Sequence, residues 1–231
     1  MKELLFCIVN VIAIFSIREL FRAYYISHLR VEYSRCHQLT DFHISLRYRI
    51  FKRVTDVIIS LLVCVSILPL LYMVLGAVIK LTSSGPIIFK HKRRGMFGQE
   101  FYCYKFRSMY ANVADKKAIR DDKRVTPVGR FIRKTHIDEV PQFYNVLIGE
   151  MSLVGPRPLP LREIKKFPNL LQKNARFLVR PGITGLVQIH SGRELPLDVY
   201  LEYDLMYVRK QSWLNDVHLM WQTLKFQDVS Y

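Results

Sequence analysis

The chain has 231 residues, of which 50% are hydrophobic and 23% are charged. The length excludes a large multidomain assembly, and the composition excludes a fully disordered chain. Lys and Arg number 35 against 19 Asp and Glu, which gives a formal charge of +16. An excess of this size indicates an anionic partner: nucleic acid, anionic lipid headgroups or a phosphorylated substrate.

The first segment, residues 1–49, joins an apolar stretch, Leu4 to Ile17, to a basic connector rich in His and Tyr. The apolar stretch resembles a signal peptide, but Arg18 and Glu19 stand where small residues would form a cleavage site. We therefore expect an uncleaved anchor or a helix at the membrane interface, and we take residues 1–49 as a membrane-associated segment.

A second apolar segment, residues 50–82, predicts a membrane helix. Residues 57–79 carry no charged side chain. A helix of that length is about 34 Å long, and a bilayer hydrocarbon core is about 30 Å thick. Pro69 in the middle of the run removes a backbone donor and predicts a bend. Ser66 can bond back to a carbonyl group of its own helix and increase that bend.

Two topologies fit this segment. Basic residues flank it on both sides, and the positive-inside rule places such flanks in the cytoplasm, which favours a re-entrant helix that bends at Pro69 and returns. An ordinary spanning helix with a proline kink also fits, because many spanning helices contain Pro. The flanking residues are Arg47, Arg49, Lys52 and Arg53 before the run, and Lys80, Lys90, Lys92, Arg93 and Arg94 after it.

Residues 83–231 predict a cytosolic domain. Short strands at 87–89 and 101–106 flank a Gly-containing turn at 95–98, which indicates a β-hairpin. We expect a helix over 135–149, with Thr135 as its N-cap.

The last stretch predicts an amphipathic helix, whose apolar face could pack in the core or dock at a membrane interface. That face carries Trp213, Val217, Met220, Trp221 and Leu224 at helical spacing.

Asp138 and Glu139 are adjacent acids in a stretch rich in arginine and lysine. Thr135 followed by an acid three positions later is a capping box, so Asp138 can serve the helix terminus while Glu139 is a surface charge. Alternatively, the pair holds Mg²⁺ against a diphosphate, or one carboxylate attacks phosphorus. The residues alone leave these alternatives open.

Four basic residues are candidates for phosphate binding. Lys105 and Arg107 alternate at the end of a strand, so both side chains can face one way. Arg157 lies between two prolines and Arg180 precedes Pro181, and rigid neighbours lower the entropy cost of presenting a guanidinium group. The alternatives are a solvated hairpin edge and ordinary loop arginines. His and Cys residues show no metal-ligand spacing, and no nucleotide-binding glycine loop or nucleic-acid module is present in the sequence.

Several motifs occur together and in order. They are Lys52-Arg53 with Asp56, Gly85-Pro86-Ile87-Ile88-Phe89, Lys105-Phe106-Arg107-Ser108-Met109, Arg124-Val125-Thr126-Pro127-Val128-Gly129-Arg130, Ile137-Asp138-Glu139-Val140-Pro141-Gln142, Met151-Ser152-Leu153-Val154-Gly155-Pro156-Arg157-Pro158 and Arg180-Pro181-Gly182-Ile183-Thr184-Gly185. From residue 50 to about residue 225, the chain resembles the bacterial sugar transferase family, the monotopic phosphoglycosyl transferases that start glycan assembly on a polyprenol phosphate.

The resemblance implies a mainly helical α+β fold, with a re-entrant membrane helix and a small cytosolic domain of amphipathic interfacial helices and a short β-hairpin. It implies residence in the bacterial inner membrane with the catalytic domain on the cytoplasmic face. The implied partners are a UDP-sugar donor, a polyprenol (undecaprenyl) phosphate acceptor and anionic membrane lipids. No nucleic acid is expected, and a homo-oligomer is left open.

The resemblance also implies roles for the site residues. The aspartate that matches Asp138 attacks the β-phosphate of the UDP-sugar, UMP leaves, and polyprenol phosphate takes the phosphosugar from the aspartyl intermediate. Glu139 matches an acid that helps to hold Mg²⁺, with Asp138 as the second carboxylate. Basic positions assigned to the substrate phosphates match Lys105, Arg107, Arg157 and Arg180.

Two other functions follow from the residues without the resemblance. A non-catalytic basic protein of the membrane surface would bind anionic lipid or nucleic acid through the +16 charge. A phosphatase or nucleotidyl transferase would use the same acids with a different leaving group. The reaction product separates these alternatives from sugar-phosphate transfer to an exopolysaccharide, O-antigen or glycoprotein precursor.

Overall fold

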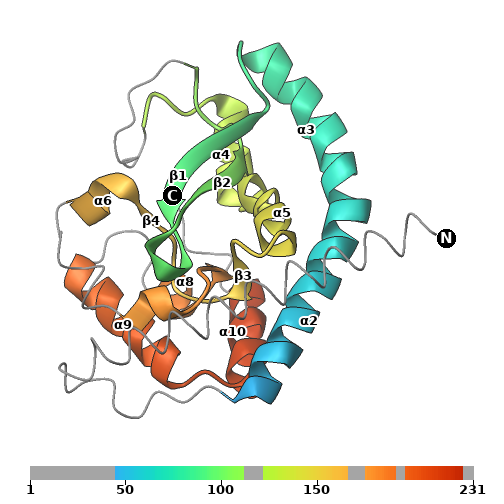
Figure 1. Cartoon of the computed structure of the whole chain (residues 1–231). Helices are drawn as coiled ribbons and strands as arrows, with labels where there is room; N and C mark the ends of the chain where they lie inside the picture. Colours follow the sequence, from blue (N-terminus) through green and yellow to red (C-terminus); the bar gives the residue numbers. More distant parts are fainter. Residues whose placement is uncertain (1–44, 112–121, 166–174, 191–195, 226–231) are drawn as a thin grey trace. The chain divides into compact units, whose positions relative to one another are not determined.

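The computed structural model describes residues 45–111, 122–165, 175–190 and 196–225 (Figure 1). The predicted segment 1–49 therefore lies outside the described residues up to residue 44. The described part is mainly helical, with a three-stranded sheet, a two-stranded sheet and one long apolar helix. The predicted α+β, mainly helical fold class is confirmed at this level.

The long apolar helix runs from Leu46 to Thr82. It consists of α2 (Leu46–Leu62), a π-helical turn (Val63–Ile67) and α3 (Leu68–Thr82), which follow one another in Figure 1. The Leu68 N–H donates to the Val63 carbonyl group, five residues back, directly before Pro69, which has no N–H to donate. Ser66 Oγ donates to the Leu62 carbonyl oxygen at 2.6 Å.

Most of this helix presents apolar side chains outward. Val65 is 70% exposed and Met73 is 65% exposed. Among the described residues, it is the one helix long and apolar enough to cross a membrane. An apolar surface of this extent is stable where lipid covers it. The re-entrant course of the helix stays a prediction.

The predicted hairpin is present, with strands longer than expected. β1 (Ile88–Arg94) pairs antiparallel with β2 (Glu100–Phe106), and β4 (Leu159–Pro160) pairs with the other edge of β1. Because directly opposed residues share a face, Arg93, Cys103 and Lys105 lie on the same face of the hairpin. That face is the buried one, since Cys103 is 2% exposed.

A second, parallel sheet of β3 (Ser152–Val154) and β5 (Gly182–Thr184) was not predicted from sequence. A Cβ atom on Gly182 would lie 2.1 Å from the Gly155 nitrogen, so the backbones can approach only because glycine lies there. This contact places the loop after β3 beside the loop before β5.

The prediction of one helix over residues 135–149 was wrong. α4 (Pro127–Lys134) ends with Thr135 as its C-cap, a 3-10 turn covers Ile137–Glu139, and α5 (Gln142–Leu147) begins after Pro141. The Thr135 hydroxyl donates to carbonyl oxygens of the preceding turn, at 3.1 Å for Phe131, so it is not an N-cap. The capping-box role of Asp138 is therefore wrong, since no helix begins at Thr135.

The remaining helices complete the domain. They are α6 (Leu161–Lys165), a 3-10 turn at Ala175–Leu178, α8 (Leu186–His190), α9 (Leu197–Arg209) and α10 (Trp213–Lys225). α10 is the predicted amphipathic helix, but Trp213 and Trp221 are exposed at 47% and 57%, whereas Asp216 and Leu219 are buried. The alternative in which the tryptophan face packs in the core is therefore wrong.

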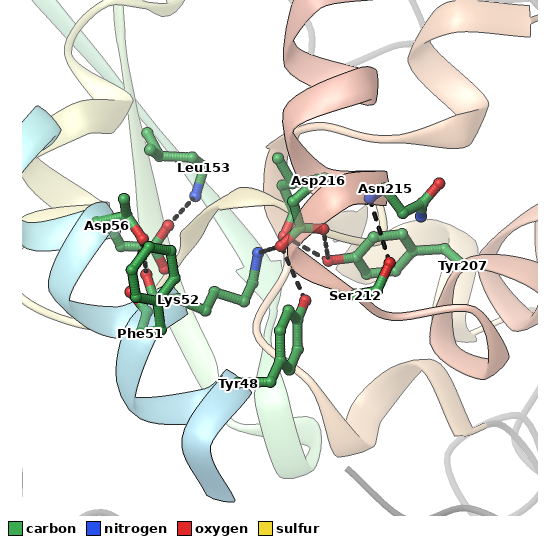
Figure 2. A network of polar contacts seen from close by, with 11 residues as sticks. Tyr48, Phe51, Lys52, Asp56, Leu153, Tyr207, Ser212, Asn215 and Asp216 are labelled. Atoms are coloured by element: carbon green, nitrogen blue, oxygen red, sulfur yellow. Dashed lines mark hydrogen bonds and ion pairs between the residues drawn. The ribbon is translucent and has the colours of Figure 1, made fainter. Parts of the chain in front are cut away.

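The base of α2 is fixed to the domain by polar contacts. Figure 2 shows the Asp216 carboxylate of α10 at the centre of this network. It accepts from Tyr48 at 2.8 Å, Lys52 at 2.6 Å and Tyr207 at 3.0 Å. The Arg53 guanidinium donates to the last carbonyl groups of α5, at 2.7 Å and 2.9 Å. The long apolar helix is thus joined at the base of α2 to the residues that follow it in the chain.

Candidate active site

The predicted acids lie together beside Lys105. Asp138 is 4% exposed, and its Oδ2 lies 3.8 Å from Lys105 Nζ. The same Lys105 ammonium donates to Glu139 Oε1. Lys105 reaches both carboxylates from the buried face of β2, so its charge offsets the repulsion between two adjacent acids.

The backbone around Asp138 has an unusual conformation. α4 begins at the cap Thr126, whose hydroxyl accepts the Gly129 N–H at 2.8 Å, a contact worth about 1 kcal/mol. At the other end of α4, His136 has φ of 55°, in the left-handed region. This residue turns the chain so that the 3-10 turn presents Asp138 toward Lys105, at a cost of about 1–2 kcal/mol for a non-glycine residue.

Arg133 is a site residue that the sequence analysis did not assign. Its Nε donates to Ser108 Oγ at 2.7 Å, which fixes the guanidinium next to the β2 exit. Burial lowers the pKa of Arg133, and the charges of Asp138 and Asp122 oppose that shift. Asp138 therefore lies within the electrostatic range of two cations, Lys105 and Arg133. In the sequence, Arg133 stands five residues before Asp138. Helical periodicity alone did not show that its side chain lies near this acid.

Four charges act on the buried thiol of Cys103. Burial raises the pKa of that thiol, Lys105, Arg93 and Arg157 oppose the rise, and Glu139 adds to it. Arg157 is therefore brought into the same region as Lys105 and Glu139.

Arg93, which sequence reasoning missed as a site residue, lies there too. Burial, with a smaller contribution from the nearby charge of Arg157, lowers the pKa of Arg93 to about 10. Clustered cations of this kind suit a polyanionic ligand.

The loops that carry Arg157 and Arg180 are adjacent. The Gly182 N–H donates to the Pro156 carbonyl oxygen at 2.9 Å, and the Gly155 N–H donates to that of Thr184 at 2.9 Å. Arg180 Nε donates to the Gly149 carbonyl oxygen at 3.0 Å, beyond the end of α5. The structure thus brings the two loops together, while this contact directs Arg180 toward α5.

Within the described part of the chain, the hydrogen bonds of the Arg107 side chain go to backbone carbonyl groups and not to Asp138 or Glu139. It is buried, and its guanidinium donates to carbonyl oxygens just past the end of α3, at 2.5 Å for Ser84 and 2.7 Å for Ser83. This arrangement satisfies carbonyl groups at a helix terminus. Its assignment to substrate phosphates stays a prediction.

A metal site at Asp138 and Glu139 is chemically reasonable. No group of three or more His, Cys, Asp or Glu side chains that could hold a metal ion occurs among the residues described. Mg²⁺ is commonly held by only one or two carboxylates together with substrate phosphates and water. Two adjacent carboxylates beside clustered cations fit that pattern of a shared protein and phosphate site.

A comparison with known protein families shows which family the chain belongs to. The sequence profile of the family described as "Bacterial sugar transferase" matches residues 47–227. The chain belongs to the bacterial sugar transferase family. The matched range contains the apolar helix from residue 47 onward, both sheets and every candidate site residue.

Relatives within the bacterial sugar transferase family carry names of sugar-phosphate transfer. A UDP-glucose:undecaprenyl-phosphate glucose-1-phosphate transferase of Klebsiella pneumoniae is 42% identical over 76% of this chain and 39% of its own length. One of the same name from Escherichia coli K12 is 39% identical over 80% of this chain and 42% of its own length. The exopolysaccharide production protein ExoY of Sinorhizobium fredii is 35% identical over 76% of this chain and 84% of its own length. The chain therefore spans about two fifths of the first two relatives and most of the third.

Proposed function

We propose that the chain is a phosphoglycosyl transferase that moves a sugar-1-phosphate from a UDP-sugar to a polyprenol (undecaprenyl) phosphate and releases UMP. The observation that carries this proposal is the buried Asp138 carboxylate, 3.8 Å from the Lys105 ammonium that also binds Glu139. Family membership and the names of the relatives supply the substrate class.

In the first half-reaction, Asp138 attacks the β-phosphorus of the UDP-sugar. A bond forms between a carboxylate oxygen and that phosphorus, and the bond to the bridging oxygen of UMP breaks, so UMP leaves with the electron pair. Cations offset the charge of the diphosphate, which lets one anion attack another. Lys105, Arg133 and Arg157 are the residues of this chain that we assign to that task.

In the second half-reaction, a phosphate oxygen of the polyprenol phosphate attacks the same phosphorus. The bond to the Asp138 oxygen breaks, which regenerates the free carboxylate and yields polyprenyl diphosphosugar. Storing the phosphosugar on the protein allows the soluble donor and the membrane-bound acceptor to bind in turn, and predicts ping-pong kinetics.

Asp138 and Glu139 are the residues that would hold Mg²⁺. When bound, the ion would neutralise phosphate charge and polarise the phosphoryl oxygens. Glu139 stays in contact with Lys105 and so keeps its carboxylate directed toward the same region as Asp138. Turnover measured with and without a chelator of divalent metal ions tests whether the reaction needs the ion.

The proposed location is the cytoplasmic face of the bacterial inner membrane. The apolar helix with basic flanks and the exposed tryptophan face of α10 support it, because tryptophan is enriched at membrane interfaces. Anionic lipids would be attracted by the +16 charge. A site at this height lets a cytosolic donor meet an acceptor whose tail stays in the bilayer.

The decisive activity test is UMP release by the full chain in lipid nanodiscs. UDP-glucose and UDP-galactose are each supplied with undecaprenyl phosphate, and UMP is measured for the wild type and Asp138→Asn. We expect release by the wild type, and loss of release in a variant with an unchanged circular dichroism spectrum. Equal turnover by the Asp138→Asn variant, or a released nucleotide other than UMP, would refute the proposal.

A further inference from the structure

Arg157 lies in a segment with very few backbone hydrogen-bond donors. Pro156 and Pro158 have no N–H group, so the Arg157 N–H is the one backbone donor of this tripeptide. The rings of Pro156 and Pro158 also fix the φ angles on either side of Arg157. The orientation of the Arg157 side chain therefore depends on the contacts that hold the Arg157 backbone.

A buried ion pair from two distant parts of the chain holds both backbone groups of Arg157. The Asp204 carboxylate of α9 accepts the Arg157 N–H. On the other side, Arg176 Nη2 donates to the Arg157 carbonyl oxygen. Arg176 Nη1 and Asp204 Oδ2 lie 3.0 Å apart, and both side chains are 3% exposed. The two charged residues and the Arg157 backbone therefore form a closed ring of contacts.

This pair is a poor source of stability. Burial raises the pKa of Asp204 to about 6 although Arg176 opposes the rise, and burial lowers the pKa of Arg176 although Asp204 and Glu163 oppose that shift. In both groups desolvation outweighs the attraction between the charges. A buried ion pair of this kind often stabilises a fold less than apolar residues of equal volume would. Its role is better sought in what it contacts, which is the Arg157 backbone.

We propose that Arg176 and Asp204 are positioning residues that clamp the backbone of Arg157 and so direct its guanidinium group toward the diphosphate of the sugar donor. The proposal rests on the proposed function, because it assumes that Arg157 contacts the donor. Neither residue touches substrate in this account. The charge of Arg157 acts on Cys103 together with Lys105 and Glu139, which is the region where the donor diphosphate would bind.

The first test compares donor and acceptor kinetics in nanodiscs. In a ping-pong reaction, kcat/KM for the donor reports only the first half-reaction, whereas a loss of folded enzyme lowers kcat/KM for both substrates by the same factor. We expect Arg157→Ala to lower the donor value about 10- to 100-fold, as for a lost hydrogen bond to a charged group. Asp204→Ala should likewise lower kcat/KM for the donor more than kcat/KM for the acceptor.

The second test is a double-mutant cycle. If Asp204 acts only through Arg157, the variant Arg157→Ala with Asp204→Ala has the same donor kcat/KM as Arg157→Ala alone, within about twofold. Asp216→Ala is the matched control, because Asp216 is also buried but contacts Tyr48, Lys52 and Tyr207. Its effect should multiply with that of Arg157→Ala and should lower both kcat/KM values equally.

Conservative variants serve if Asp204→Ala does not fold. Asp204→Asn keeps an acceptor for the Arg157 N–H. Arg176→Lys keeps the charge but loses the planar fork whose two nitrogens contact Asp204 and Arg157 separately. We expect both to give the donor-specific pattern more weakly. Multiplicative effects in the cycle, an equal loss for donor and acceptor, or no effect of Arg157→Ala would each overturn the clamp. Absence of UMP release by the wild type with every UDP-sugar would instead overturn the proposed function.

Discussion

Asp56 in α2 accepts the backbone N–H of Leu153 in β3 through a buried hydrogen bond of 3.0 Å between residues 97 positions apart (Figure 2). Leu153 belongs to the strand that leads to Arg157. The long apolar helix is therefore bonded directly to the sheet whose following loop carries a candidate phosphate ligand. This bond couples the position of the apolar helix to that of the candidate site.

Asp56→Ala should destabilise the protein by about 1 to 3 kcal/mol, because it leaves the buried Leu153 N–H without its acceptor. Denaturant unfolding in detergent micelles measures this change. Thr55→Ala is the matched control, since the Thr55 hydroxyl donates only to carbonyl groups of its own helix. The control should stay within about 0.5 kcal/mol of the wild type. Equal stability of the Asp56 and Thr55 variants would contradict the coupling.

Lys105→Gln should lower turnover about 100-fold or more, because it removes the cation that lies beside both Asp138 and Glu139. UMP release in nanodiscs measures the effect. Lys90→Gln is the matched control: it removes the same charge from the paired strand, where the ammonium lies over the Tyr104 ring on the exposed face. A similar loss in both variants would indicate that overall charge, rather than the contact with the acids, matters.

Local patterns in the sequence predicted local structure well. The short strand-like stretches on either side of the Gly95–Gly98 turn predicted the hairpin, and the helical spacing of the residues around Trp213 and Trp221 predicted α10. The short strands β3 and β5 were missed because a three-residue strand carries too little periodicity to detect. Their pairing depends on Gly155 and Gly182 fitting against one another, which is a tertiary contact.

The site was predicted in composition but not in geometry. Adjacent acids and alternating basic residues identified Asp138, Glu139 and Lys105, which the structure brings together. The Thr135 signature suggested an N-cap because local spacing cannot reveal the left-handed turn at His136. Long-range contacts, such as that between Arg53 and the end of α5, had no local signal at all.

Asp204 predicts a pH dependence of stability. Its pKa is raised from 3.8 to about 6 by burial, so the folded protein holds this proton more tightly than the unfolded chain. The contribution of Asp204 to the free energy of unfolding is therefore fully present below pH 4. It falls by about 2 to 3 kcal/mol as the pH rises through 6. The groups that face it are Arg176, the Arg157 backbone and the Arg157 charge.

The measurement is denaturant unfolding of the wild type and Asp204→Asn between pH 4 and pH 8. Other carboxylates titrate in both proteins and cancel in the difference. We expect the wild type to lose stability relative to Asp204→Asn as pH rises from 4 to 6, with a constant difference above pH 7. A difference that does not change with pH would mean that Asp204 titrates alike in both states.

A re-entrant helix predicts that both ends of the apolar run lie in the cytoplasm, because both flanks are basic. Ser45→Cys and Ser84→Cys test this at exposed positions, in a background whose four native cysteines are replaced by alanine. In intact spheroplasts, a membrane-impermeant maleimide should label neither cysteine, and after lysis it should label both. Labelling of only one of the two in intact spheroplasts would indicate a spanning helix.

The proposed mechanism requires a covalent intermediate on Asp138, which mass spectrometry of the trapped protein can detect. The nanodisc-embedded chain is incubated with an active UDP-sugar and no acceptor, quenched in acid and digested. We predict one sugar phosphate on Asp138 in the peptide that contains it, absent from Asp138→Asn and removed when undecaprenyl phosphate is added before quenching. UMP release without any adduct, or an adduct on another residue, would contradict the account.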